Sequence, residues 1–170
     1  MQRISLLEPD SADPSAKRIM ENLLKQFGVV IPPVKALAHK PDLLRAVLSL
    51  TNTAHGKGEI DLGLKEIINI RASMINGCEF CVKMHSSLAQ SHKVSSDKIN
   101  AAKEGSKNSI FADEERTVLR FCEESTEKVS VSDKTFNDLK DSFSEPAIIE
   151  IVGVVSTINL WNRIIVGLGF

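Results

Sequence analysis

The sequence predicts an all-α protein, and three observations support this. Apolar residues recur with a helical period along nearly the whole chain, strand-like alternation is scarce, and glycines gather where helices would end. The 170 residues are 42% apolar and 25% charged, which is ordinary for a globular protein. A chain of this length buries about 70% of its surface without a disulfide or metal. We expect one domain over residues 1–170 with about eight helices.

Start and stop signals place the elements of the first half. Asp13-Pro14 supplies a helix N-cap and first residue, and Gly28 ends that helix. Each proline of the next segment disfavours helix in the residue before it, so we expect that segment to be extended. The elements expected in this half are helices over 14–27, 34–54 and 61–75, a break of the second helix near 39–41, an extended segment over 29–33, and a loop over 55–58.

The second half continues with helices. Asn76-Gly77 is a typical C-terminal stop, and Ser95 and Ser132 are N-cap residues. The expected helices cover 78–92, 95–105, 113–129, 132–143 and 146–166. The last is the most apolar, but its interior polar residues would be costly at the centre of a bilayer, so we interpret it as a buried core helix. Glu66 and Glu150 lie in similar apolar surroundings, which leaves open a duplicated helical unit.

Charge and aromatic content exclude several classes of partner. The chain has 21 basic and 22 acidic residues, a formal net charge of −1, no Tyr and one Trp. A basic field and a base-stacking platform are therefore lacking, and we expect no nucleic-acid partner. We also expect no membrane partner. The first residues contain no apolar run of signal-peptide length, which predicts a cytoplasmic protein in a reducing compartment.

The informative segment is a cysteine pair at the start of a predicted helix. Cys78 and Cys81 follow Asn76-Gly77, where free N–H groups and the helix dipole stabilise a thiolate. His85 shares a helix face with both cysteines, within about 60°, and imidazole beside a thiol can take its proton. Glu66, at the edge of the preceding helix's apolar stripe, could orient the imidazole. We expect His92 to be a helix-end residue and the third cysteine, Cys122, to be a buried small hydrophobe.

Several interpretations of this segment compete. The cysteines could be packing residues, or Cys78, Cys81 and His85 could bind zinc with Glu66 or water as fourth ligand. A c-type haem site would need histidine directly after the second cysteine, where Val82 stands. A thioredoxin fold would need a strand before the motif, where a helix is predicted. We favour redox chemistry on a helical scaffold, without cofactor or metal.

The run from Glu66 through Asn76-Gly77-Cys78-x-Phe80-Cys81 to His85 resembles the signature of the AhpD-like alkylhydroperoxidases, within the carboxymuconolactone decarboxylase superfamily. The resemblance extends to the N-terminal half, from Phe27-Gly28 to Leu43-Leu44, and to Leu160-Trp-Asn-Arg163, as in the peroxidase-related subgroup. It implies an all-helical fold that assembles as trimers or hexamers, and a thiol peroxidase free of metal and haem. The non-redox decarboxylase branch typically lacks the cysteine pair, which argues against lactone decarboxylation.

The resemblance also implies a role for each residue. Cys81 would attack the peroxide, Cys78 would resolve the product, and His85 and Glu66 would relay protons. The position of Cys78 nearer the helix start would favour it as the attacking thiol, but we follow the pairing of Cys81 with His85. Phe80 stands where some members carry a polar side chain, which favours organic hydroperoxides. The expected partners are a small hydroperoxide and a dithiol reductant, such as a lipoyl- or thioredoxin-like protein. The alternative function is a redox switch or disulfide carrier with little peroxidase activity.

Overall fold

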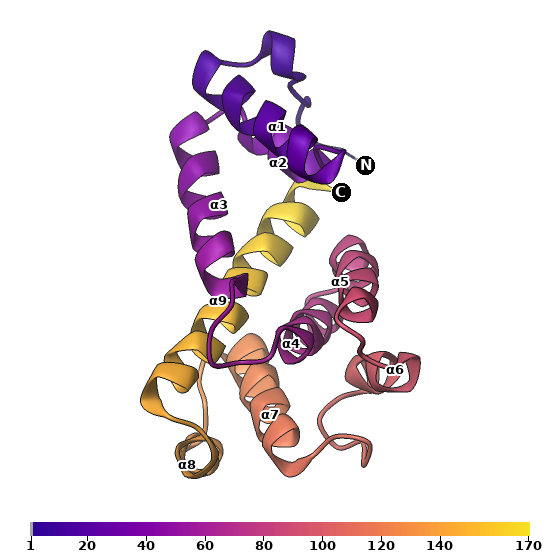
Figure 1. Ribbon diagram of the computed structural model, residues 1–170, viewed down its shortest axis with the longest axis vertical. Helices are drawn as coiled ribbons and strands as arrows, with labels where there is room; N and C mark the ends of the chain where they lie inside the picture. Colours follow the sequence, from indigo (N-terminus) through magenta and orange to yellow (C-terminus); the bar gives the residue numbers. More distant parts are fainter. Residues whose placement is uncertain (1) are drawn as a thin grey trace. The chain divides into compact units, whose positions relative to one another are not determined.

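The computed structural model describes residues 2–170, and this range contains nine α-helices, one short 3-10 helix and no strand (Figure 1). The all-α prediction is therefore confirmed. The helices are α1 (Pro14–Phe27), α2 (Pro32–Leu37), α3 (Pro41–His55), α4 (Leu62–Ile75), α5 (Glu79–Ser91), α6 (Ser96–Glu104), α7 (Asp113–Lys128), α8 (Asp133–Ser142) and α9 (Glu145–Leu168), with the 3-10 helix at Pro9–Ser11.

The chain divides into two compact units. One holds the residues up to Thr53 together with Ile164–Phe170, and the other holds Ala54–Arg163. In the first unit, Asp13 caps α1 by accepting the Ser15 N–H at 2.8 Å, and Gly28 ends this helix with a left-handed φ of 73°. Both signals were predicted from the sequence, because short acceptors favour N-caps and glycine favours left-handed C-caps.

The unit Ala54–Arg163 is built around α4, which packs against α5, α6 and α7. A buried cluster joins these helices through Ile67 and Ile70 of α4, Ala89 of α5 and Leu119 of α7. Polar residues of α4 are buried as well, and they include Lys65 and Glu66. The expected apolar stripe with Glu66 at its edge is therefore wrong, because α4 has neighbours on most of its sides.

Several helix boundaries differ from the sequence prediction by one or two residues, and two helix starts among them change how a helix is capped. Pro32 and Pro33 open α2 instead of ending an extended segment. A proline is tolerated in the first turn of a helix, where its missing N–H would have no helical partner. Cys78 is the N-cap of α5, with φ −91° and ψ 84°, and not the first helical residue. The predicted break of the second helix is confirmed, since α2 ends at Leu37 and α3 begins at Pro41.

Of the helices in residues 2–170, α9 alone is long and apolar enough to cross a membrane by length and composition, and 44% of its most apolar window is buried. Its Thr157 and Asn162 are almost fully buried. The Thr157 hydroxyl donates to the Gly153 carbonyl at 2.7 Å, and the Asn162 amide donates to the Ser73 hydroxyl at 3.0 Å. These contacts are those of a core helix.

Candidate active site

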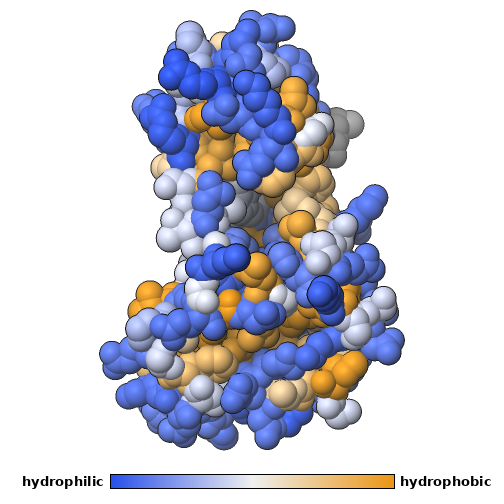
Figure 2. Space-filling view, viewed as in Figure 1, coloured by the Kyte–Doolittle hydropathy of each residue, from blue (hydrophilic) through white to orange (hydrophobic). Residues whose placement is uncertain are grey.

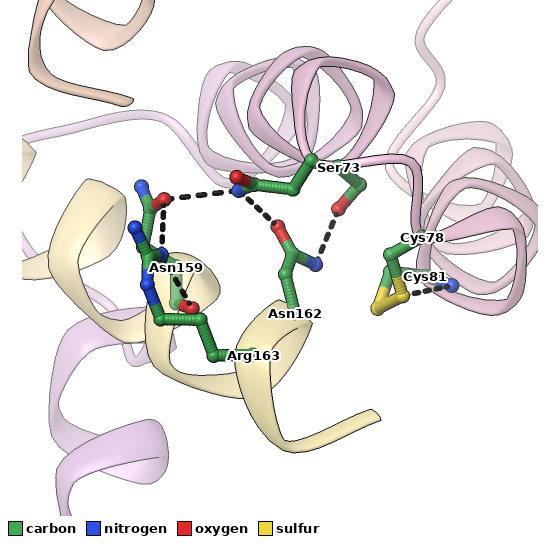
Figure 3. Close-up of a disulfide and its surroundings, with 7 residues drawn as sticks. Ser73, Cys78, Cys81, Asn159, Asn162 and Arg163 are labelled. Carbon is green, nitrogen blue, oxygen red and sulfur yellow. Dashed lines mark hydrogen bonds between the residues drawn. A yellow bond between two sulfur atoms is a disulfide. The ribbon is translucent and has the colours of Figure 1, made fainter. Parts of the chain in front are cut away.

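A disulfide joins Cys78 and Cys81, with their Cα atoms 5.3 Å apart (Figure 3). The turn before it is set by Gly77, whose φ of 68° lies in the left-handed region that favours glycine. The Cys78 N–H donates to the Ser73 carbonyl at 2.9 Å, which ties the pair to the end of α4. The Cys78 sulfur accepts the Cys81 N–H at 3.4 Å, as a side-chain cap would. Both cysteines are buried, so the protein controls access to each sulfur.

A buried carboxylate–imidazole pair lies on the same two helices. The His85 Nδ1 atom of α5 lies 2.6 Å from the Glu66 Oε2 atom of α4, and each side chain is 8% exposed. An ionised carboxylate only accepts hydrogen bonds, so this contact favours the tautomer in which Nδ1 carries a proton and donates it to Glu66, with Nε2 facing away from the carboxylate. His85 follows Cys81 by one turn of α5. The structure thus pairs Cys78 with Cys81 and His85 with Glu66, on two helices, α4 and α5, that pack against each other.

A second histidine, which the sequence analysis did not single out, joins this pair. The His55 ring, at the end of α3, stacks on the His85 ring with centroids 6.2 Å apart and planes inclined by 21°. Its Nε2 atom lies 3.1 Å from the Asn69 Oδ1 atom of α4. The sequence assigned His55 to a loop. Its position directly after the predicted helix over 34–54 was the available signal, but the spacing could not show which ring it would meet.

A buried ion pair holds the segment that follows His55. Lys65 is 1% exposed and pairs with Glu150 of α9. The Lys65 ammonium also donates to the carbonyls of Ala54 and Gly56, at 3.1 and 2.6 Å. Hydrogen bonds of this kind satisfy a charge that burial would otherwise strongly destabilise. Because Ala54 and Gly56 flank His55, this ion pair supports the histidine that stacks on His85.

Amide side chains of α9 hold the turn before the disulfide (Figure 3). The Asn76 amide donates to Asn159 and to Asn162, at 2.9 Å in each case. Asn162 in turn donates to the Ser73 hydroxyl at 3.0 Å. Ser73 and Asn76 lie on either side of the last residues of α4, so this network restrains the backbone just before Cys78.

A cavity of about 560 Å³ opens beside the start of α5. Cys78, Val82 and Ser86 line it, with Lys83 nearby on the same helix and Lys103 at the end of α6. Cys81 and His85 are not among its lining residues. Of the two disulfide cysteines, only Cys78 is therefore a lining residue of this cavity.

The two remaining predictions concern residues outside this group. His92 is the exposed C-cap of α5, as expected of a helix-end residue. Cys122 is fully buried and unpaired in a disulfide, which confirms the packing prediction. Burial raises the pKa of its thiol to about 12. Within residues 2–170, no group of three or more His, Cys, Asp or Glu side chains is arranged to hold a metal ion.

Fold and site together define an all-helical protein with a Cys-x-x-Cys disulfide at a helix start and a buried Glu–His pair beside it. The profile of the carboxymuconolactone decarboxylase family matches residues 41–124, a range that includes all four predicted site residues. A protein of unknown function from Agrobacterium tumefaciens, named as a candidate AhpD of antioxidant defence, is 30% identical, with a TM-score of 0.72 over 78% of this chain and 91% of its own.

Two further solved structures share the fold over 99% of this chain. One is an uncharacterized peroxidase-related protein with an alkylhydroperoxidase AhpD core from Ralstonia eutropha JMP134, 19% identical, with a TM-score of 0.87 over 90% of its length. The other is the debrominase Bmp8 in complex with 2,3,4-tribromopyrrole, 22% identical, with a TM-score of 0.84 over 91% of its length. The chain belongs to the AhpD-like carboxymuconolactone decarboxylase superfamily.

Proposed function

We propose that this protein is a thiol-dependent peroxidase that reduces organic hydroperoxides through Cys78 and Cys81. One observation carries the proposal: a disulfide at the start of α5 lies one helical turn from a histidine bonded to a buried carboxylate at 2.6 Å. Two cysteines that form a disulfide can store the two electrons that a peroxide takes up. A histidine whose orientation is fixed by a carboxylate is a suitable group for moving the accompanying protons.

The proposed reaction starts from the reduced pair. The Cys81 thiolate attacks one peroxide oxygen, the O–O bond breaks, and the alkoxide leaves as an alcohol after taking a proton. Cys81 is then a sulfenic acid, and the Cys78 thiol attacks its sulfur to form the disulfide and release water. The Nε2 atom of His85 accepts the thiol proton in the first step and delivers one to the leaving oxygen. Glu66 holds the ring in the tautomer that this exchange requires.

The proposed substrate and reductant follow from the site's composition. The protein has little net charge, and the apolar Phe80 lies between the two cysteines beside Glu79, so a small neutral organic hydroperoxide suits this site better than a polyanion. An external dithiol, either a free small molecule or one carried by a lipoyl- or thioredoxin-like protein, returns the disulfide to two thiols. The reaction needs no metal or organic cofactor.

A steady-state assay with cumene hydroperoxide and dihydrolipoamide tests the proposal. We expect consumption of both compounds in equal amounts, lost in the Cys81→Ser variant and retained in Cys122→Ser. Rapid thiol–disulfide exchange without peroxide consumption would instead identify a redox switch or disulfide carrier. Release of bromide from 2,3,4-tribromopyrrole, without peroxide consumption, would indicate the reaction named for the debrominase neighbour. Either result would reject the peroxidase function.

Apolar side chains at the surface support assembly into a homo-oligomer, which we propose to be a trimer or hexamer. Figure 2 shows orange apolar residues among the hydrophilic ones. Phe27, Val29 and Ile149 are 62%, 56% and 70% exposed in the single chain. Exposed apolar side chains mark contacts between subunits where they form a contiguous patch. Sedimentation equilibrium should show three or six chains, and a monomer at micromolar concentration would contradict the assembly. We also propose a cytoplasmic location, where dithiol reductants are available.

A further inference from the structure

The two cysteines of the disulfide are placed differently with respect to the cavity beside α5. Cys78 is a lining residue of this cavity of about 560 Å³ and is 2% exposed, whereas Cys81 does not line it and is 0% exposed. Thiol–disulfide exchange depends on which sulfur the incoming thiolate can reach. The position of Cys78 at the cavity therefore favours its sulfur as the one that a reductant attacks.

The walls of the cavity indicate what kind of thiol fits. Ser86 lines the cavity, and its hydroxyl oxygen is buried without a hydrogen-bond partner among the described residues. A buried hydroxyl without a partner is costly, so a ligand that hydrogen-bonds to it would be stabilised. Lys83 and Lys103 bring two positive charges to the lining and Glu79 brings one negative charge, while Val82 offers an apolar wall. The excess of positive charge favours an anionic ligand with a short apolar chain.

We propose that this cavity receives a small anionic dithiol and that its thiolate attacks the Cys78 sulfur, with Cys81 as the leaving group. This proposal rests on the proposed function, because it concerns how the same disulfide is reduced. It assigns a direction to the exchange and a chemical class to the reductant.

The exchange balances in two steps. The first thiolate of the reductant bonds to the Cys78 sulfur, the Cys78–Cys81 bond breaks, and Cys81 departs as a thiolate one turn from His85. The second thiol of the reductant loses its proton and attacks the reductant's own sulfur in the mixed disulfide, which releases Cys78 as a thiolate. Two electrons pass from the dithiol to the protein, and the reductant leaves as a cyclic disulfide.

Trapping of the mixed disulfide tests the direction of attack. The oxidised wild-type protein is mixed with 2-mercaptoethanesulfonate, a monothiol that cannot complete the second step, and is quenched within seconds with N-ethylmaleimide. Cleavage after glutamate separates the cysteines, since Glu79 lies between them, and mass spectrometry then locates the adduct. We expect it on Cys78 in at least about tenfold excess, whereas an equal distribution or an excess on Cys81 would overturn the proposal. The protein unfolded in guanidinium is the control and should show no such preference.

A charge reversal tests the class of thiol. Lys83→Glu should slow the reaction with 2-mercaptoethanesulfonate about fivefold relative to neutral 2-mercaptoethanol, because a nearby attractive charge becomes repulsive. The matched control is Lys107→Glu, an exposed lysine that does not line the cavity, and it should leave this ratio unchanged. If Lys83→Glu left the ratio of the two rates unchanged, the proposal that the reductant is anionic would be overturned. Neither experiment contains peroxide, so failure here is distinguishable from failure of the peroxidase function.

Discussion

The three cysteines differ in what surrounds each sulfur. Cys78 caps a helix and borders a cavity, Cys81 is enclosed on the face shared with His85, and Cys122 lies in the core, 3.6 Å from the Ile68 carbonyl oxygen. A thiol is nucleophilic only as its thiolate. Burial keeps Cys122 protonated, because its pKa rises to about 12. Of the three cysteines, we therefore expect only Cys78 and Cys81 to take part in thiol chemistry.

Alkylation kinetics can test this difference. After reduction at pH 8, iodoacetamide should modify Cys78 and Cys81 well before Cys122, which should react only as the protein unfolds. The reason is that a thiol with a pKa of about 12 is almost wholly protonated at this pH. Mass spectrometry of timed samples measures the order. Modification of all three cysteines at similar rates in the folded protein would contradict the account.

Glu66→Gln tests the carboxylate that orients His85. A glutamine amide can donate as well as accept, so it no longer selects the tautomer with the proton on Nδ1. We expect the rate of sulfenic acid formation to fall by about 100-fold, the size of a general acid–base contribution. The control is Glu114→Gln, at an exposed position of α7, which should leave the rate unchanged. Equal rates in both variants would remove Glu66 from the proposed proton relay.

The sequence located four residues of this site because their chemistry follows a local spacing. Cys78, Cys81 and His85 lie on one helix, and Glu66 lies on the helix before it. His55 and Asn69 escaped prediction because their contact depends on how the chain around His55 packs on α4 within the unit Ala54–Arg163. Periodicity gives the face of a residue on its own helix but not the side chain that it meets on another.

At the scale of elements, the segment between α3 and α4 is held by charges. Glu150 of α9 accepts the Glu59 N–H at 2.8 Å and the Ile60 N–H at 3.3 Å, and it also pairs with buried Lys65. The sequence indicated a similarity between Glu150 and Glu66, but it could not assign Glu150 a partner from another helix. Whether the two glutamates mark a duplicated unit stays a prediction. In the structure Glu150 supports a loop, whereas Glu66 orients His85.

Two glycine substitutions probe this arrangement. A Cβ atom on Gly58 would overlap the Glu150 carboxylate, so Gly58→Ala should lower the free energy of unfolding by about 1–3 kcal/mol. The matched control is Gly153→Ala in the middle of α9, where nothing lies within 4 Å of the added atom. That variant should be more stable by about 0.5–1 kcal/mol, because alanine favours helix over glycine. Denaturant unfolding measures both, and an unchanged stability of Gly58→Ala would contradict the packing described.

The same carboxylate predicts a dependence of stability on pH. Burial works to raise the pKa of Glu150, but hydrogen bonds from Lys65 and from the Glu59 and Ile60 N–H groups outweigh it and lower the pKa. Its stabilising effect is therefore complete above the ordinary carboxyl pKa of about 4.3 and is lost as the pH falls through the lower folded value. Glu150→Gln should cost about 3 kcal/mol at pH 7 and reduce the loss of stability on acidification. If the free energy of unfolding changed with pH in the same way for wild type and variant between pH 2 and 7, the result would contradict this assignment.

At the scale of the whole molecule, the helical class and most helix positions were predictable, whereas the grouping of helices was not. Caps such as Asp13 and stops such as Gly77 act locally, so the sequence located them well. The described chain divides into two compact units. That residues 1–170 form one domain stays a prediction. The family profile ends at residue 124, yet Glu150, Asn159 and Asn162 of α9 support the site from beyond that range.

Sulfenic acid trapping tests the central claim of peroxide reduction at Cys81 most directly. The reduced Cys78→Ser variant, which lacks the resolving thiol, is treated with one equivalent of cumene hydroperoxide in the presence of a dimedone probe. We predict one probe per chain, attached to Cys81, and one equivalent of cumyl alcohol. An unlabelled Cys81, with the hydroperoxide left intact, would contradict the account.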